Sequence, residues 1–301
     1  MGSRAVALLS TFGLLLSSLA PVLATPVGSE PRALGQTFLG TDSGSAPSSQ
    51  SLEHTSHRDH EHDTVYADDS VAATAAPSWF TSTLLARRLL ALSTTGVIST
   101  IFPSPAPDKS HTPVSLAGQS VSLREYISDC DEHLPSHTSH GGNGDPTLLG
   151  LHVSTTFRNI AAGSNLSLSI DWWDHLADTN PVFPGFPPSE AGLPRVTLFG
   201  YLDEFPTPVP EDTRAALTDC YTKAHPDARV WLPGRPGSPH SSFWARMVVT
   251  EVYWIGGFGG LQQIGWINGT EWKGIRRRGS LEGVGDGRGW EDVRLPGEEA
   301  H

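Results

Sequence analysis

The chain has 301 residues, with 20 Lys or Arg against 32 Asp or Glu, so its formal net charge is −12 at pH 7. A nucleic-acid-binding surface needs clustered positive charge, and this balance argues against a nucleic-acid partner. Only two cysteines occur, which excludes a disulfide scaffold and means that a hydrophobic core must stabilise the fold.

The N-terminus has the pattern of a secretory signal peptide. Arg4 precedes an apolar run from Ala5 to Leu19, and Ala24 follows Val22 at the spacing that signal peptidase reads. We predict cleavage near Ala24, hence a signal peptide over residues 1–24 and an extracellular or vacuolar/lysosomal destination. A buried N-terminal helix is the alternative. The run is too short and too polar to be a membrane anchor, and no later segment qualifies as one.

Residues 25–77 are rich in small and polar residues and show no sustained periodicity. Such a segment cannot bury enough apolar surface to offset chain entropy, so we predict a disordered leader. Within it His54, His57, His60 and His62 have a spacing that could collect a metal ion. A solvated tract is favoured, because no scaffold fixes the ligand geometry, and no metal site is predicted.

The ordered part is predicted to begin at Ser78, which can cap a helix with Leu85, Leu89 and Leu92 on its apolar face and Arg87 and Arg88 on its polar face. A second helix is expected from Pro210 to Pro226, and a short helical turn near 157–161. Strands are predicted over 94–102, 114–127, 148–155, 165–173, 195–205, 242–260 and 261–267. Gly200 marks an expected β-bulge. Short strands separated by prolines favour an antiparallel barrel over a doubly wound sheet.

These elements form one predicted domain over residues 78–272, followed by a charged, Gly-rich tail over 273–301. The strand stretch at 242–260 is apolar on both sides, with Trp244, Val248, Val252 and Trp254 assigned to its second face, and it ends in a glycine-rich cluster over 256–260. A strand of this kind belongs to a barrel or to an interface.

Cys130 and Cys220 leave two alternatives. In an oxidising lumen they could form the single disulfide that two cysteines permit. Cys220 also lies on the apolar stripe of the second predicted helix, where a buried free thiol is the other reading. Cys130 could on paper join His133, His137 and His140 in a zinc site, but a flexible insertion over 130–146 is favoured.

Two sequons, at Asn165 and Asn268, are predicted N-glycosylation acceptors, because a signal peptide precedes them. No catalytic residue is predicted. Asp171 and His175 place an acid near an imidazole, yet no nucleophile occurs in a recognisable setting.

Five segments carry a family resemblance: RRLLALSTTGVISTI, LHVSTTFRNIAAGSNLSLSI, TNPVFPGF, AHPDARVWLPGRPGSPHSSFW and VTEVYWIGGFGG. Over roughly residues 86–272 the chain resembles the CREG-type branch of the pyridoxamine 5'-phosphate oxidase-like FMN-binding split barrels. The resemblance implies a mainly β (α+β) fold, an antiparallel split β-barrel with a few peripheral helices. It also implies a secreted or lysosomal glycoprotein, and a homodimer in which a second copy covers the second face of the strand at 242–260.

The resemblance also implies where a flavin phosphate would lie. In flavin-using split barrels, hydroxyls and a basic side chain hold it at a strand-to-helix turn, which here corresponds to Ser154, Thr155, Arg158 and Asn159. Helix capping explains the same residues equally well. Because the CREG branch generally lacks the flavin contacts, a non-catalytic binding or interaction protein is favoured, and an FMN-dependent oxidoreductase is the alternative. The sequence identifies no receptor or small-molecule ligand.

Overall fold

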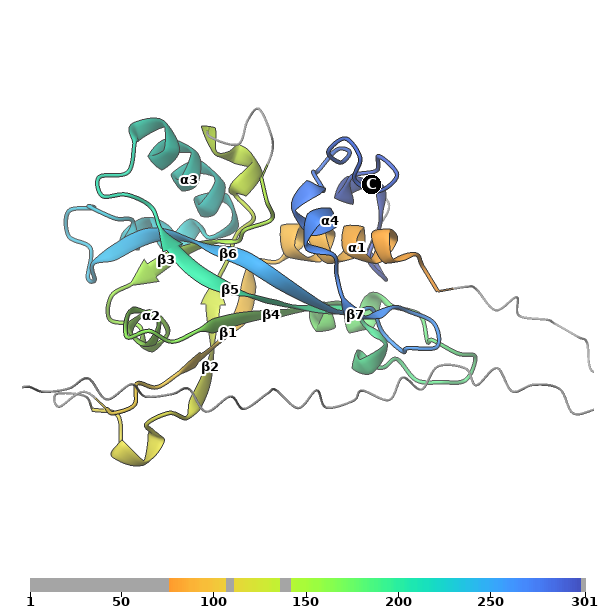
Figure 1. Cartoon of the computed structure of the whole chain (residues 1–301), viewed down its shortest axis with the longest axis horizontal. Helices are drawn as coiled ribbons and strands as arrows, with labels where there is room; N and C mark the ends of the chain where they lie inside the picture. Colours follow the sequence, from red (N-terminus) through yellow and green to blue (C-terminus); the bar gives the residue numbers. More distant parts are fainter. Residues whose placement is uncertain (1–75, 107–110, 136–141, 299–301) are drawn as a thin grey trace, which may run out of the picture. The chain divides into compact units, whose positions relative to one another are not determined.

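The computed structural model describes residues 76–106, 111–135 and 142–298, shown in colour in Figure 1. These residues form a seven-stranded sheet in which every neighbouring pair is antiparallel, in the order β2-β1-β4-β5-β6-β3, with β7 also paired to β6. The strands are β1 (Thr95–Ile101), β2 (Ser120–Tyr126), β3 (Thr147–Leu151), β4 (Leu166–Asp171), β5 (Arg195–Glu204), β6 (Ser242–Ile255) and β7 (Ile264–Trp266). The sheet curls into a half-barrel, which confirms the predicted split-barrel α+β class.

Helices lie around this sheet and at its ends (Figure 1). They are α1 (Trp79–Leu92), α2 (Thr155–Ala161), α3 (Glu211–Ala224) and α4 (Gly269–Gly274). The Ser78 hydroxyl accepts a hydrogen bond from Thr81 N at 3.1 Å, so the predicted cap of α1 is confirmed. Helix α3 ends at Ala224, just before His225 and Pro226, as predicted.

Strand β4 shows how the sequence pattern builds the sheet. Its alternating residues Leu166, Leu168 and Ile170 are buried, as predicted, because β4 lies between β1 and β5 and turns one face into the main core. This core also contains Ile98, Val196, Leu198, Met247, Val249, Val252 and Trp254 from the neighbouring strands.

Strand β6 carries a β-bulge that corrects the predicted division of its faces. Phe199 pairs with Glu251 whereas Gly200 pairs with Val249, so Thr250 is the extra residue. The bulge at Gly200 is confirmed, and a Cβ at Gly200 would collide with the Val248 carbonyl oxygen. Because the extra residue shifts the alternation, Val252 and Trp254 face the same core as Met247 and Val249.

A second core lies under α3 and contains Trp244, which the sequence pattern places on the second face of β6. Trp244 packs there with Leu217, Tyr221, Ala228 and Leu134, and only 2% of its surface is exposed. Cys130 and Cys220 are joined by a disulfide beside this core. Trp244, Val252 and Trp254 are thus already covered within the chain, so they cannot form the predicted dimer seam.

Helix α1 departs most clearly from the sequence prediction. Its expected polar residues Arg87 and Arg88 are buried, with 0% and 7% of their surface exposed, whereas Leu92 is 40% exposed. Arg87 Nη1 donates to the Trp272 carbonyl oxygen at 3.0 Å, and Nη2 lies 3.9 Å from Asp129 and 3.7 Å from Glu132. The guanidinium also lies over the Trp272 ring, 5.2 Å from its centroid. The two carboxylates therefore supply counter-charge and the carbonyl supplies one hydrogen bond, while Nε and Nη2 make no hydrogen bond within the described residues.

The C-terminal segment covers the same side of α1, so the prediction of a tail from residue 273 is corrected. Ile275, Val293 and Leu295 are buried against α1 and the main core. Glu298 pairs with both Arg88 Nε, at 2.7 Å, and Arg88 Nη2. The sequence did not predict this packing, because the segment is rich in charged residues and glycine. Its three buried apolar residues also follow no sustained period.

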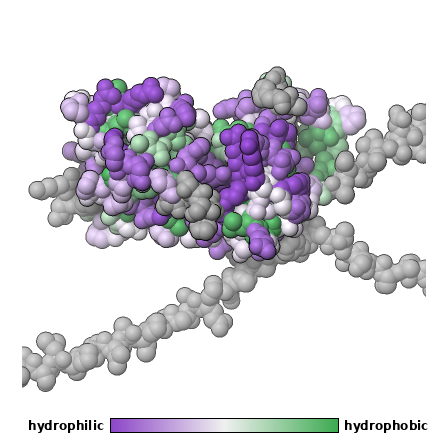
Figure 2. All heavy atoms as spheres, turned by 90° about the horizontal axis from the view of Figure 1, so that it is seen from above, coloured by the Kyte–Doolittle hydropathy of each residue, from purple (hydrophilic) through white to green (hydrophobic). Residues whose placement is uncertain are grey.

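The face of the molecule seen in Figure 2 carries many hydrophilic residues, with hydrophobic ones in small groups. No helix in the described part of the chain combines the length and apolar character needed to cross a bilayer. The predicted signal peptide, almost all of the predicted leader and its four histidines lie outside the described residues.

We expect Arg87→Leu to lower the free energy of unfolding by about 3–5 kcal/mol, because it leaves the Asp129 carboxylate buried without a counter-charge. Urea unfolding of the purified chain measures the change. The double variant R87L/D129L should recover part of the loss, because it removes the orphaned charge. The exposed Arg158→Ala is the control and should change stability by less than about 0.5 kcal/mol. A small effect of R87L alone would contradict the structural role of this pair.

Candidate functional site

The predicted phosphate turn joins β3 to α2. Ser154 is the N-cap of α2 in an extended conformation, but its side chain makes no capping hydrogen bond. Its hydroxyl instead donates to Glu125 Oε1 at 3.3 Å, and the Thr156 hydroxyl donates to the same oxygen at 2.5 Å. The hydroxyls at the start of the helix are therefore directed at a carboxylate.

Glu125 reaches this turn from β2, the edge strand that pairs with β1. Burial raises the pKa of the Glu125 carboxyl, and the hydrogen bonds from Thr156 and Ser154 oppose that increase. Sequence reasoning missed this residue, since nothing in the local pattern SLREY links it to a hydroxyl 29 residues later. Only the pairing of β2 and β1, with α2 packed on β1, brings the two together.

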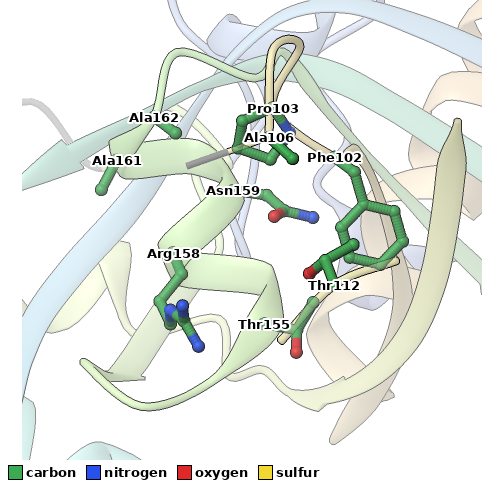
Figure 3. A pocket seen from close by; sticks show the side chains of 9 residues that line it. All are labelled: Phe102, Pro103, Ala106, Thr112, Thr155, Arg158, Asn159, Ala161 and Ala162. Carbon is green, nitrogen blue, oxygen red and sulfur yellow. The ribbon is translucent and has the colours of Figure 1, made fainter. Parts of the chain in front are cut away.

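The other predicted residues divide between the core and a pocket. Asn159 is buried, and its amide donates to the Thr100 hydroxyl at 3.0 Å. Thr155, Arg158 and Asn159 line a cavity of about 320 Å³ between α2 and the chain around Phe102 and Thr112 (Figure 3). Arg158 is exposed, and its side chain makes no hydrogen bond or ion pair with any other described residue.

The predicted residues thus lie on one turn, but their donors do not converge on a common point. Ser154 donates to Glu125 and Asn159 to Thr100, which leaves Thr155 and Arg158 as the donors at the cavity. A phosphate at the helix start would meet the Glu125 carboxylate at close range, and like charges repel strongly where water is scarce. The residues present do not fit the phosphate of FMN, so the phosphate turn remains a prediction without structural support.

Both predicted glycosylation acceptors are exposed. Asn165 lies in the loop between α2 and β4. Asn268 is the N-cap of α4, and its Oδ1 accepts hydrogen bonds from Thr270 N at 2.8 Å and Glu271 N at 3.2 Å. The capping role uses only the oxygen of the amide, so the nitrogen is left for a glycan.

The described part of the structure gives no support for a metal-binding or catalytic role of the other candidate residues named from the sequence. Cys130 belongs to a disulfide and cannot be a zinc ligand, while His137 and His140 lie outside the described residues. Within the described ranges no cluster of three His, Cys, Asp or Glu side chains could hold a metal ion. His175 stacks on the Trp172 ring, with 3.5 Å between the ring centroids, which gives it a packing role.

A second group of ionisable residues surrounds the Arg87 guanidinium next to the disulfide. Asp129, Asp131 and Asp145 are three carboxylates in this group, and Glu132 is a fourth at its edge. Asp131 Oδ2 accepts from Asn143 N at 2.5 Å, and Asp145 Oδ1 accepts from Val249 N at 2.8 Å. The first bond joins the two ends of the predicted flexible insertion to each other, and the second ties its C-terminal end to β6. Residues 136–141 of the insertion lie outside the described part.

Burial raises the pKa of Asp129 from an ordinary value of 3.8 to about 6, and the nearby Arg87 charge opposes the increase. Burial also raises the pKa of Asp145, against the hydrogen bond from Val249 N. The folded state therefore holds protons on these carboxyls at pH values where the unfolded chain has lost them.

Comparison with known families identifies the class of the protein. The model of the family described as "CREG, beta-barrel" matches residues 80–273, which is more than half of the chain. The chain belongs to the CREG β-barrel family. The match ends where the C-terminal segment begins to cover α1.

Comparison with curated proteins finds no match. Among solved structures, the chain is similar to a heme binding protein from Mycobacterium smegmatis, with 17% identity and a TM-score of 0.41, covering 65% of this chain and 60% of that chain. It is also similar to a FAD-binding protein from Mesorhizobium loti, with 14% identity and a TM-score of 0.32, covering 55% of this chain and 87% of that one.

We expect the protein to become more stable as the pH falls from about 6 to 4. The pKa of Asp129 is raised in the folded state, so its contribution is fully present below 3.8 and is lost as the pH rises to about 6. The expected difference is on the order of 3 kcal/mol between pH 4 and pH 7. Urea unfolding at a series of pH values measures it.

Asp129→Asn should remove most of this pH dependence, and Asp174→Asn, at an exposed aspartate, should leave it unchanged. The raised pKa values of Glu125 and Asp145 act in the same direction and leave a smaller slope in D129N. A slope that is the same in D129N and in the parent chain would contradict the assignment.

Proposed function

We propose that this chain is a non-catalytic binding or interaction protein of the secretory pathway, built on a CREG-type split barrel. The observation that carries the proposal is the Glu125 carboxylate at the start of α2. It accepts from the Ser154 and Thr156 hydroxyls at the turn where a flavin-using relative would place the phosphate. The alternative, an FMN-dependent oxidoreductase, would need that phosphate position to be free of negative charge.

An extracellular or vacuolar/lysosomal location is part of the proposal. The disulfide between Cys130 and Cys220 is of the kind that persists in oxidising compartments. The predicted signal peptide and the two exposed sequon asparagines agree with that route. The raised pKa of Asp129 would stabilise the fold in an acidic lumen.

We further propose that the protein is a homodimer, with its contact surface on the outer face of β5, β6 and β7. Phe199, Tyr253 and Trp266 gather there, with ring centroids 5.7 Å apart for Phe199 and Trp266 and 5.1 Å apart for Tyr253 and Trp266. Trp266 is 56% exposed. A second copy would remove these rings from water. This surface differs from the seam predicted from the sequence, because Trp244, Val252 and Trp254 of that seam are buried in the cores of the chain itself.

We expect the purified chain not to bind FMN. Titration with FMN, followed by quenching of flavin fluorescence, should show no saturable binding up to about 100 μM, where a micromolar site would be filled. If the carboxylate is the reason, Glu125→Gln should give measurable binding, because it keeps the hydrogen-bond acceptor and removes the charge. Saturable binding to the parent chain that Arg158→Ala weakens would contradict the proposal and support the oxidoreductase.

We expect light scattering combined with absorbance and refractive index to give a protein mass of two chains, plus a separate glycan mass. Trp266→Glu should yield a folded monomer, because it places a charge in the proposed contact. Val114→Glu, at a residue that is 81% exposed and lies outside the proposed contact, should remain a dimer.

The double variant N165Q/N268D should abolish the glycan mass without uncapping α4, because a carboxylate oxygen can accept the same two backbone hydrogen bonds. A monomeric parent chain would refute the dimer, and a chain without glycan would refute the acceptors.

A further inference from the structure

A second cavity lies at the β7 end of the sheet and shares no lining residue with the cavity at the α2 turn. Its volume is about 280 Å³. Three segments form its walls: the loop before β5, the β6–β7 loop, and Pro296 and Gly297 of the C-terminal segment. Figure 1 shows the green loop before β5 and the blue β6–β7 loop together at this end. We call this cavity the neutral pocket; its lining residues used below are Asn180, Ser189, Phe258, Leu261 and Gln262.

The walls of the neutral pocket are fixed by backbone contacts. A Cβ at Gly257 would lie 2.6 Å from the Gly192 carbonyl oxygen, and one at Gly297 would lie 2.5 Å from that of Asp178. Both glycines have positive φ values, +138° and +74°. The Trp172 indole N–H also donates to the Pro296 carbonyl at 2.8 Å. The three segments therefore approach as closely as glycine allows, and the pocket is formed before any ligand arrives.

The lining combines unpaired neutral polar groups with an aromatic ring. The side chains of Asn180, Ser189 and Gln262 make no hydrogen bond to any other residue in the described ranges. Phe258 packs edge-to-face against Phe186, with the ring centroids 6.1 Å apart, and Phe186 packs in the same way against Phe183. Phe183 is 48% exposed and Phe186 is 39% exposed, so the aromatic row extends from the pocket to the surface.

No side chain that lines the neutral pocket is ionisable, although the chain as a whole carries a net charge of −12. A charged ligand would lose its hydration there without a counter-charge, and a purely apolar ligand would strand the amide and hydroxyl groups. The fitting ligand has neutral hydroxyl groups and also an apolar face. A sugar ring has both, because its hydroxyls can donate and accept while its C–H face packs on an aromatic ring.

We propose that the neutral pocket binds one hexose-sized, uncharged sugar ring. The volume lies at the lower end of the range for small-molecule sites, which admits one ring rather than a large ligand. The ring would stack on Phe258 and exchange hydrogen bonds with Gln262, Asn180 and Ser189. The source of the ring is either a free sugar or a residue of a glycan. The inference gives the proposed binding function a ligand class, and it does not depend on the α2 turn.

Saturation-transfer NMR on the full chain tests the proposal. The chain is first treated with an endoglycosidase, so that its own glycans do not compete. The probes are methyl α-glucopyranoside, methyl α-mannopyranoside and methyl β-galactopyranoside, with glucuronate as the charged counterpart. We expect saturable binding of at least one methyl hexoside in the millimolar range and much weaker binding of glucuronate. A neutral oligosaccharide that binds over tenfold tighter than its methyl hexoside identifies a glycan source; equal affinity identifies a free sugar.

Phe258→Ala and Gln262→Ala should each weaken binding about tenfold, which corresponds to about 1.4 kcal/mol. Gln119→Ala, at an exposed glutamine outside the pocket, should bind as the parent chain does. Should Phe258→Ala fail to fold, the nearly isosteric Gln262→Glu places a charge in the pocket and should also abolish binding.

Three outcomes would overturn the proposal: no methyl hexoside saturates up to about 100 mM, glucuronate binds as tightly as the methyl glucoside, or binding persists unchanged in both Gln262 variants. None of them would affect the FMN titration, so failure here is distinguishable from failure of the proposed function.

Discussion

A single buried charge, the Arg87 guanidinium, ties together the parts of this fold that lie outside the sheet. An arginine without exposed surface is tolerated only if carboxylates and carbonyls replace its hydration. Asp129 and Glu132 come from the segment that carries the disulfide, and the carbonyl of Trp272 comes from α4. Arg87 thus joins helix α1 both to the segment next to the disulfide and to the chain after β7. Burial beside this guanidinium raises the pKa of the Asp129 carboxyl, and the nearby carboxylates of Asp131, Glu132 and Asp145 add to the increase, which links the stability of the fold to pH.

The bulge at Thr250 is the second constraint, because it keeps the residues on both sides of it in the main core. Met247 and Val249 before the bulge and Val252 and Trp254 after it face this core, whereas Trp244, on the opposite face of β6, packs in the core beneath α3. One long strand thereby joins two cores, and neither needs a second copy of the chain to cover it. The outward aromatic rings of Phe199, Tyr253 and Trp266 are what the sheet leaves exposed instead.

Two of the cavities in the described part of the barrel differ in character. At the α2 turn, the Ser154 and Thr156 hydroxyls donate to the Glu125 carboxylate, and Arg158 lines the cavity next to that turn. At the β7 end, glycine contacts bring three loops together around neutral polar groups and a phenylalanine. The differences between the two sites come from loops and edge strands rather than from the sheet that both share.

The sequence by itself determined the local elements: the Ser78 cap, the alternation of β4, the bulge at Gly200, the end of α3 and, through its family resemblance, the split barrel. These features depend on neighbours along the chain, where periodicity and turn chemistry are informative. Only the tertiary structure decided the burial of Arg87 and Arg88, the packing of the C-terminal segment, the position of Glu125 and the neutral pocket. Each depends on partners distant along the chain, and a side chain's charge state and exposure follow from those partners rather than from its own segment.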